Sequence, residues 1–265
     1  MHISDFVLAL HRCLPPATAM EGDRLGLLVQ SGRMDIHRLL VCLDVTLSVL
    51  EEAKVKGVDT ILTFHPLIFS PLTSVLSDHR VGACVEYAIR EGIAIISAHT
   101  NVDAHPRGTN AVFAERMGWK VETVLIPDTK FYGHGMGVIC TLPEEEKATV
   151  ESVVALVRSE CGSPVRWSNG SGRNVQRIAV VCGSGSSFLQ SAREARADVF
   201  VTADVRYHTF LEAEGKIAII DPGHFEMEQF VPVAMKKIVE DEVLKGSAAL
   251  EILVSQVSTN PLRYT

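Results

Sequence analysis

Uniformly apolar runs of strand length alternate with amphipathic helical stretches along most of the chain. The clearest runs are LLVCLDV (39–45), DTILTFH (59–65), GIAIISAH (92–99), RIAVVCG (177–183), DVFVTAD (198–204) and KIAIIDP (216–222). Strands that lack a polar side are normally covered on both faces, because helices pack against each side of the sheet. The pattern therefore predicts an α/β fold in which mixed sheets are flanked by helices.

The N-terminal stretch shows a helical pattern instead. MHISDFVLALHRCLPPA has no basic leader region, and Asp5, His11 and Arg12 interrupt its apolar residues. Pro15 and Pro16 follow, and proline cannot continue a helix. The pattern predicts an amphipathic first helix that ends before these prolines, rather than a signal peptide.

Two segments, Arg38–Thr63 and Arg177–Thr202, match each other without a gap. The identical positions include Arg38 and Arg177, Leu50 and Leu189, Ala53 and Ala192, Asp59 and Asp198, and Thr63 and Thr202. An internal duplication would produce this match, and so would two strand–helix–strand units that resemble each other through shared physics. Proline and glycine punctuate residues 126–137. We therefore expect two related α/β domains, residues 1–128 and residues 129–265.

Composition excludes several classes of protein. The 265 residues are 47% hydrophobic and 22% charged, with a mean hydropathy of +0.19, which supplies a sizeable core. No run of about 18 uncharged apolar residues occurs, so no membrane-spanning helix is expected. The net charge is -7 and no Lys/Arg-rich block occurs, so nothing indicates nucleic-acid binding. The six cysteines include no C-x-x-C pair, which favours a reduced, cytoplasmic protein.

Side chains that can bind metal ions or move protons follow the predicted strands. His65 ends one apolar run and His99 ends the next, with Asp103 four residues later. In the second half, Asp204 and His208 follow a similar run. In open α/β sheets, ligands bind outside the carboxyl ends of the strands. We therefore expect these side chains to lie at the functional edges of their sheets.

The stretch IAIIDPGHFEMEQF adds His224 and Glu228 where the last apolar run ends. Side chains four residues apart lie on one face of a helix. The pair therefore suits two ligands of one metal ion, and it equally suits a surface ion pair. Two related halves that face each other would bring His65, His99 and Asp103 towards this pair, which predicts a metal site between the domains.

The chemistry of these side chains limits which ions they suit. Imidazole nitrogens and carboxylate oxygens together suit Zn, Mn, Fe, Co or Ni, and a carboxylate can bridge two such ions. A structural role remains an alternative, because a histidine at a strand end often only forms hydrogen bonds that stabilise the fold. His99 and Asp103 also suit a hydrogen-bonded pair that stabilises a turn.

The Gly/Ser-rich stretch VCGSGSSFLQ (181–190) follows a strand and begins a helix. That layout can bind phosphate at a helix N-terminus. The stretch lacks the lysine of a Walker A loop and the full G-x-G-x-x-G spacing. A tight strand-to-helix turn is the favoured interpretation.

Five stretches of the chain, taken in order, resemble the motifs of one family. EGDRLGLLVQSG (21–32) resembles W-D-N-x-G-L-x-x-G, TFHPLIF resembles H-H-P, and SAHTNVDAHPRGTN resembles A-H-T-x-x-D. ADVFVTADVRYH is similar to D-x-x-x-T-G-D/E-x-x-x-H, and DPGHFEMEQ to G-H-x-x-x-E. Over essentially its whole length, the chain resembles the Nif-three-like family. These are dinuclear-metal-centre proteins that are often labelled GTP cyclohydrolase type 2 homologues.

The resemblance implies that one or two divalent ions per chain are bound by four ligands, namely His65, Asp103, His224 and Glu228. Asp103 and Glu228 would be the bridging carboxylates, and His99 would be a further ligand or a hydrogen-bonding support for one. The resemblance also implies two related α/β domains without the inserted domain of longer members. It further implies assembly into a toroidal homohexamer.

Two functions fit these expectations. The first is a metal-dependent hydrolase that acts on a small, phosphorylated or nucleotide-like substrate, with water activated by the ion and with His99 moving protons. The second is a non-catalytic hexameric scaffold or partner-binding protein that holds metal for structural or regulatory reasons. An open coordination position would favour the enzyme, and a closed one would favour the scaffold.

The chain departs from the family motifs at three places. The paired histidines are reduced to Phe64 and His65, and a phenyl ring cannot bind a metal ion. The W-D-N element is Gly22-Asp23-Arg24, and the glycine of T-G-D is Ala203. The alanine matters only if the backbone there needs a positive φ. The loss of one imidazole predicts fewer than two tightly held metal ions per chain.

Overall fold

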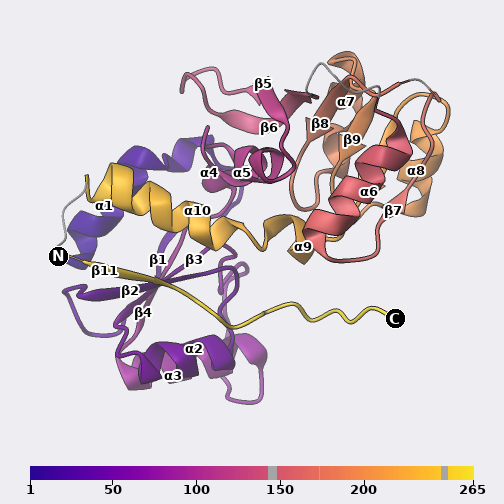
Figure 1. The fold of residues 1–265 in the computed structure, drawn as a ribbon. Helices are drawn as coiled ribbons and strands as arrows, with labels where there is room; N and C mark the ends of the chain where they lie inside the picture. Colours follow the sequence, from indigo (N-terminus) through magenta and orange to yellow (C-terminus); the bar gives the residue numbers. More distant parts are fainter. Residues whose placement is uncertain (143–147, 173, 246–249) are drawn as a thin grey trace. The chain divides into compact units, whose positions relative to one another are not determined.

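The computed structural model describes residues 1–142, 148–172, 174–245 and 250–265 (Figure 1). The chain forms two compact units, which are described separately. The first comprises Met1–Val102 and Val231–Pro261, and the second comprises Asp103–Phe230 and Leu262–Thr265. The boundary at residue 128 that the sequence suggests lies just after a strand of the second unit, and residues 231–261 return to the first.

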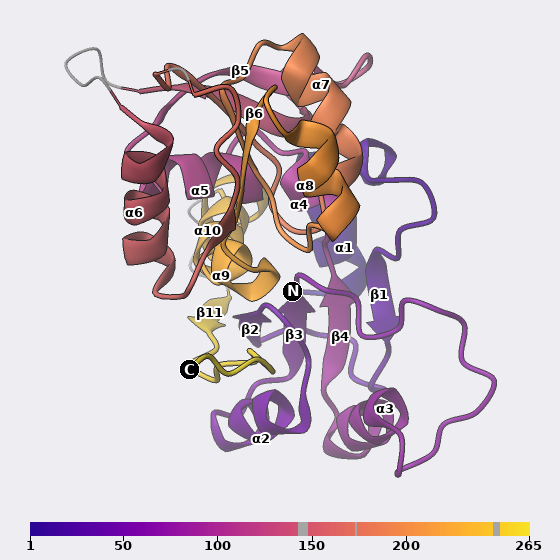
Figure 2. The same ribbon diagram turned by 90° about the vertical axis from the view of Figure 1, so that its right-hand side faces the viewer.

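The first unit contains a five-stranded sheet in the order β1 (Gly26–Val29), β4 (Ala94–Ser97), β3 (Thr60–Thr63), β2 (Arg38–Cys42) and β11 (Glu251–Val254). β4, β3, β2 and β11 run parallel, and β1 pairs antiparallel with β4. Helices α2 (Leu47–Val55) and α3 (Arg80–Glu91) cover one face of the sheet (Figure 2). Helices α1 (Ile3–Cys13) and α10 (Val231–Ile238) lie on the other side, and α10 continues into a π-helical turn (Val239–Val243).

The second unit contains a six-stranded sheet in the order β5 (Lys120–Pro127), β6 (Gly135–Thr141), β8 (Arg177–Val180), β9 (Val199–Val201), β10 (Ala218–Asp221) and β7 (Arg166–Trp167). β8, β9 and β10 run parallel, whereas β5, β6 and β7 add antiparallel pairs. Helices α5 (Thr109–Arg116) and α6 (Val150–Cys161) pack on one face, and α7 (Leu189–Glu194) and α8 (Tyr207–Ala213) pack on the other. Both sheets are mixed and flanked by helices, which confirms the predicted fold class.

Alternate residues along the central strands explain why both faces are apolar. Ile178 and Val180 of β8 belong to the core under α5 and α6, whereas Ala179 belongs to the core under α7. Side chains alternate between the two faces of a sheet with a period of two. A strand covered on both sides therefore has no polar side, and the apolar runs of the sequence reflect this.

The two matched segments make the same bonds in the two units. The carboxylate of Asp59 accepts hydrogen bonds from the backbone N–H groups of His37 and Arg38. Asp198, the matching residue, accepts from the backbone N–H groups of Gln176 and Arg177. Each aspartate thereby ties the start of its own strand to the start of the neighbouring parallel strand. Shared strand–helix–strand physics does not require the same side chain at this place, so the agreement favours an internal duplication.

The first helix, α1, spans Ile3–Cys13 and ends before Pro15, as its sequence pattern predicts. It buries Ile3, Phe6 and Leu10. Within the described ranges, no helix combines the length and the apolar character that crossing a membrane requires. All six cysteines are free thiols, and five of them are buried.

Candidate metal centre

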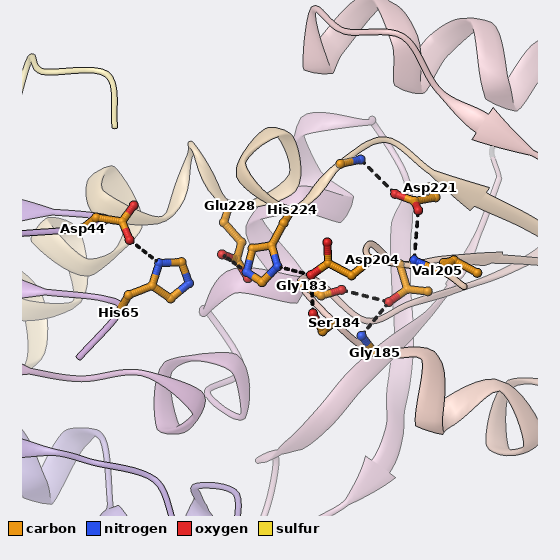
Figure 3. A network of polar contacts seen from close by, with 12 residues as sticks. Asp44, His65, Gly183, Ser184, Gly185, Asp204, Val205, Asp221, His224 and Glu228 are labelled. Carbon is orange, nitrogen blue, oxygen red and sulfur yellow. Dashed lines mark hydrogen bonds and ion pairs between the residues drawn. The ribbon is translucent and has the colours of Figure 1, made fainter. Parts of the chain in front are cut away.

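In the first unit, His65 lies two residues after the end of β3 and is oriented by an acid that follows β2. Its backbone N–H donates to the carbonyl of Leu43 at 2.9 Å, which continues the pairing of the two strands. Its Nδ1 lies 2.9 Å from Oδ1 of Asp44 (Figure 3). The other carboxylate oxygen of Asp44 accepts from the Thr259 hydroxyl at 2.8 Å. Burial alone would raise the pKa of Asp44, but the hydrogen bonds from His65 and Thr259 outweigh it and lower the pKa. An ionised Asp44 keeps the proton of His65 on Nδ1, which makes Nε2 the atom that can bind a metal ion.

His99 follows β4 and has the same kind of partner. Its Nδ1 lies 2.8 Å from Oδ1 of Asp23, and Oδ2 of Asp23 accepts from the backbone N–H of Thr100 at 3.1 Å and from the Thr100 hydroxyl. The pKa of Asp23 is lowered, because these hydrogen bonds outweigh the opposing effect of burial. The ring of His99 is thus oriented by Asp23, whereas the sequence suggested a turn-stabilising bond to Asp103.

In the second unit, helix α9 (His224–Glu228) presents both of the side chains predicted for it. Nε2 of His224 lies 3.0 Å from Oε2 of Glu228, one helical turn further on. Nδ1 of His224 lies 2.7 Å from Oδ2 of Asp204, and this oxygen also accepts a hydrogen bond from the Ser184 hydroxyl (Figure 3). Asp204 has a φ of +54°, a conformation that aspartate tolerates better than most residues. The imidazole therefore lies between two carboxylates.

This position decides the charge of His224. Burial lowers its pKa, but the hydrogen bonds and charges of Glu228 and Asp204 more than compensate and raise it from 6.5 to about 9. The sequence left open whether His224 and Glu228 are an ion pair or metal ligands. They form an ion pair here, and a metal ion at Nε2 would have to displace the proton that this pairing holds there.

Glu228 is 3% exposed, and its carboxylate rests against the backbone of Gly183. Gly183 has a φ of +67°, and a Cβ atom there would come within 2.5 Å of Oε1 of Glu228. The turn is closed by the Thr202 hydroxyl, which donates to the carbonyl of Gly183 and accepts from the N–H of Gly185. The Gly/Ser-rich stretch is therefore the expected tight turn, and its glycine makes room for the carboxylate.

Asp103 begins the second unit, and Asn110 fixes its backbone. The amide of Asn110 donates to the carbonyl of Asp103 at 3.0 Å, and its oxygen accepts from the N–H of Cys182 at 2.8 Å. The pKa of the Cys182 thiol is raised well above its usual value by burial and then by the charges of Glu228 and Asp103. Asn110 therefore links the backbone of Asp103 to Cys182, the residue before Gly183.

The residues that depart from the family motifs have clear structural roles. Phe64 is fully buried, and its ring centroid lies 5.1 Å from that of His65 and 5.2 Å from that of His99. It thus packs against both imidazoles, whose own centroids are 5.5 Å apart. Ala203 is fully buried and does not have a positive φ, so its side chain causes no backbone strain.

The structure adds partners that the sequence interpretation missed. Asp44 ends a predicted strand, so the rule that selected His65 could have found it. Asp23 lies in the segment that was counted as a departure, and Thr259 carries no recognisable signal. His208, which the sequence placed beside Asp204 as a candidate, is exposed on α8, and its ring lies edge-on to that of Tyr207.

Comparisons with known proteins identify the family of the chain. A family profile described as Duf34/NIF3 (NGG1p interacting factor 3) matches residues 1–261. A Lactococcus lactis protein named GTP cyclohydrolase 1 type 2 homolog is 31% identical over 263 residues, which cover 98% of each chain. A Clostridium perfringens protein of the same name is 30% identical over 254 residues, or 95% of each chain.

Solved structures show the same fold. A Staphylococcus aureus hypothetical protein matches with a TM-score of 0.91 at 27% identity, over 100% of this chain and 99% of that one. A Bacillus cereus protein related to NIF3 matches with a TM-score of 0.90 at 23% identity and the same coverage. With a profile match over nearly its whole length and relatives of this similarity, the chain belongs to the Duf34/NIF3 (NGG1p interacting factor 3) family.

Proposed function

We propose that this protein binds divalent metal ions through His65, Asp103, His224 and Glu228. One observation carries the proposal: each of the three candidate histidines has its Nδ1 held by its own aspartate, at 2.7–2.9 Å. Metal-binding histidines almost always direct their second ring nitrogen to such an acceptor, which fixes the tautomer and the orientation of the ring. A histidine with a purely structural role does not require such an aspartate, and here all three histidines have one.

The residues of each unit fit a metal ion in further ways. Two imidazoles and two carboxylates are a donor set that suits Zn, Mn, Fe, Co or Ni. In the second unit, the missing Cβ of Gly183 leaves room for the Glu228 carboxylate close to His224. We propose that the ligands of the two units serve one common centre of one or two ions, with Asp103 and Glu228 as bridging carboxylates. His99 would be a further ligand or would carry protons.

The reaction that best fits such a centre is hydrolysis of a small, phosphorylated or nucleotide-like substrate. A bound divalent ion would supply Lewis acidity and lower the pKa of water. Asp44, Asp23 and Asp204 would hold the three imidazoles in fixed tautomers. His99 is hydrogen-bonded to an ionised Asp23 and is therefore suited to accept a proton and to release it again. The relatives named GTP cyclohydrolase 1 type 2 homolog support a nucleotide-like substrate.

The test combines metal analysis of the purified protein with an activity screen in the presence of Mn²⁺, Zn²⁺ or Co²⁺. We expect at least one ion per chain, which His65→Ala and His224→Ala should weaken or remove. His208→Ala is the matched control, because His208 is exposed and makes none of these bonds to an aspartate. Retention of the metal by both ligand variants would contradict the proposed site. A metal-loaded protein without hydrolytic activity would favour the non-catalytic scaffold.

A further inference from the structure

The segment that follows β11, Ser255–Thr265, has no helix or strand and yet follows a defined path. The backbone N–H of Ser255 donates to the carbonyl of Val41 at 2.9 Å, which extends the pairing of β11 with β2 by one residue. Val257 packs against the core that α2 and α3 cover. The first part of this segment is therefore anchored to the sheet of the first unit.

Thr259 comes next and contacts the acid that orients His65. Its hydroxyl donates to Oδ2 of Asp44 at 2.8 Å, while Oδ1 of the same carboxylate lies 2.9 Å from Nδ1 of His65. Because both oxygens are engaged, the carboxylate cannot rotate without losing a hydrogen bond. Thr259 thus fixes the orientation of His65 through Asp44.

Tyr264, near the end of the segment, contacts the helix that carries the ligands of the second unit. Its pKa is raised to about 12 by burial, by a hydrogen bond to the carboxylate of Glu226 and by the charge of Asp221. Glu226 is 3% exposed and lies on α9 between His224 and Glu228. The hydroxyl also lies 3.1 Å from the position that a Cβ atom of Gly223, the residue before α9, would occupy. Tyr264 therefore contacts the first turn of α9.

These two contacts belong to one short stretch of chain. Tyr264 follows Thr259 by five positions, so only four residues lie between them. Pro261 restricts the residue before it to extended conformations, which reduces the freedom of the link. A single segment thus makes one contact in each unit, the first to the acid that orients His65 and the second to the helix that carries His224 and Glu228.

We propose that Ser255–Thr265 is a strap that positions the metal ligands of both units, with Thr259 and Tyr264 as its positioning residues. The inference rests on the proposed metal binding, and it adds residues outside the ligand set and outside every motif of the sequence. Loss of a hydrogen-bonding partner behind a ligand typically weakens metal binding by about 10–100-fold. Removal of either hydroxyl should weaken binding within that range.

The experiment uses the full chain with Thr259→Val and Tyr264→Phe, which remove the hydroxyl groups and keep nearly the same volume. Thr259→Ser retains a hydroxyl and should restore binding. Thr123→Val and Tyr207→Phe are matched controls, since Thr123 is exposed on β5 and Tyr207 is 71% exposed on α8. Zn²⁺ affinity is measured by competition with a chelator, and amide hydrogen exchange of residues 224–228 and 255–265 is measured without added metal.

We expect both test variants to bind Zn²⁺ about tenfold more weakly or worse, and the serine variant and the controls to bind as the wild type does. Tyr264→Phe should also speed amide exchange in α9. If the wild type binds Zn²⁺ and both test variants bind it with the same affinity, the proposed strap is wrong. The proposed metal site is not affected by that result. If the wild type binds no metal, the proposed function fails. Amide exchange then decides alone, and unchanged protection of α9 in Tyr264→Phe refutes the strap.

Discussion

Replacement of Gly183 by alanine tests the geometry of the second unit most sharply. The new Cβ would lie 2.5 Å from Oε1 of Glu228, and real Cβ atoms essentially never approach another atom closer than 3.0 Å. Glu228 is 3% exposed and is paired with His224, so its carboxylate has little room to move. The positive φ of +67° adds a backbone strain of about 1 kcal/mol for any residue other than glycine.

Two effects can therefore be separated. Gly215 has a φ of +69° and no atom within 4 Å of its hypothetical Cβ. Gly215→Ala should show the backbone strain alone, as a loss of about 1 kcal/mol in the free energy of unfolding. Gly183→Ala should lose at least as much stability and should also displace the Glu228 carboxylate.

Metal sites need their ligands within about 0.5 Å of the productive position. The displacement forced on Glu228 is of that order, so we expect Gly183→Ala to weaken Zn²⁺ binding at least tenfold, or about 1.4 kcal/mol. Gly215→Ala should bind Zn²⁺ as the wild type does. Competition with a chelator measures the affinity, and urea unfolding of the metal-free protein measures the stability. Wild-type affinity in Gly183→Ala would refute the assignment of Glu228 as a ligand.

Four further predictions follow from the same arrangement. Elemental analysis after mild dialysis should find fewer than two tightly bound ions per wild-type chain, and Phe64→His should raise this number towards two. Two equally tight ions in the wild type would show that Phe64 does not weaken the site. Asp44→Asn should weaken Zn²⁺ binding about 10–100-fold, measured by chelator competition; an unchanged affinity would remove His65 from the ligand set. The pKa of His224 is raised from 6.5 to about 9, so its contribution to the stability of the metal-free protein should be full below pH 6.5 and lost as the pH rises through 9; urea unfolding of His224→Gln should show a smaller decline over this window, and an equal decline would refute the pairing. Light scattering should give the mass of a hexamer, and a monomer across micromolar concentrations would contradict the oligomeric state that the family resemblance implies.

Local patterns of the sequence predict much of the fold. A strand covered on both faces presents apolar side chains on both sides. The runs RLLVC and RIAV therefore predict buried parallel strands without any knowledge of the tertiary structure. The match between Asp59 and Asp198 also preserves a structural bond, because each carboxylate satisfies two backbone N–H groups. Such features are local, and so the sequence predicts them well.

The return of the chain to the first unit had no comparable signal. β11 (Glu251–Val254) is four residues long, and nothing in EILV specifies that it pairs with β2 rather than with a strand of the second unit. The choice depends on the packing of α10 and on the space beside β2, both of which exist only in the folded chain. Residues 231–261 therefore appeared to belong to the second half.

In the candidate site too, some residues could be predicted from local sequence patterns and others could not. His65, His99, His224 and Glu228 could be selected because they stand where apolar runs end. Their partners could not all be selected, because a hydrogen bond such as that from Thr259 to Asp44 joins residues 215 positions apart. A threonine in a stretch without helix or strand has no distinctive pattern.

The central claim is that ligands from both units hold the same ion. Zn²⁺ titrations of the wild type, His65→Ala, His224→Ala and the double variant test it most directly, with His208→Ala as the control. We predict that each single variant weakens the same tight binding step, and that the effects in the double variant are not additive, since both residues act on one ion. Removal of two independent binding steps by the two variants, or an unchanged tight step in either one, would contradict a shared metal centre.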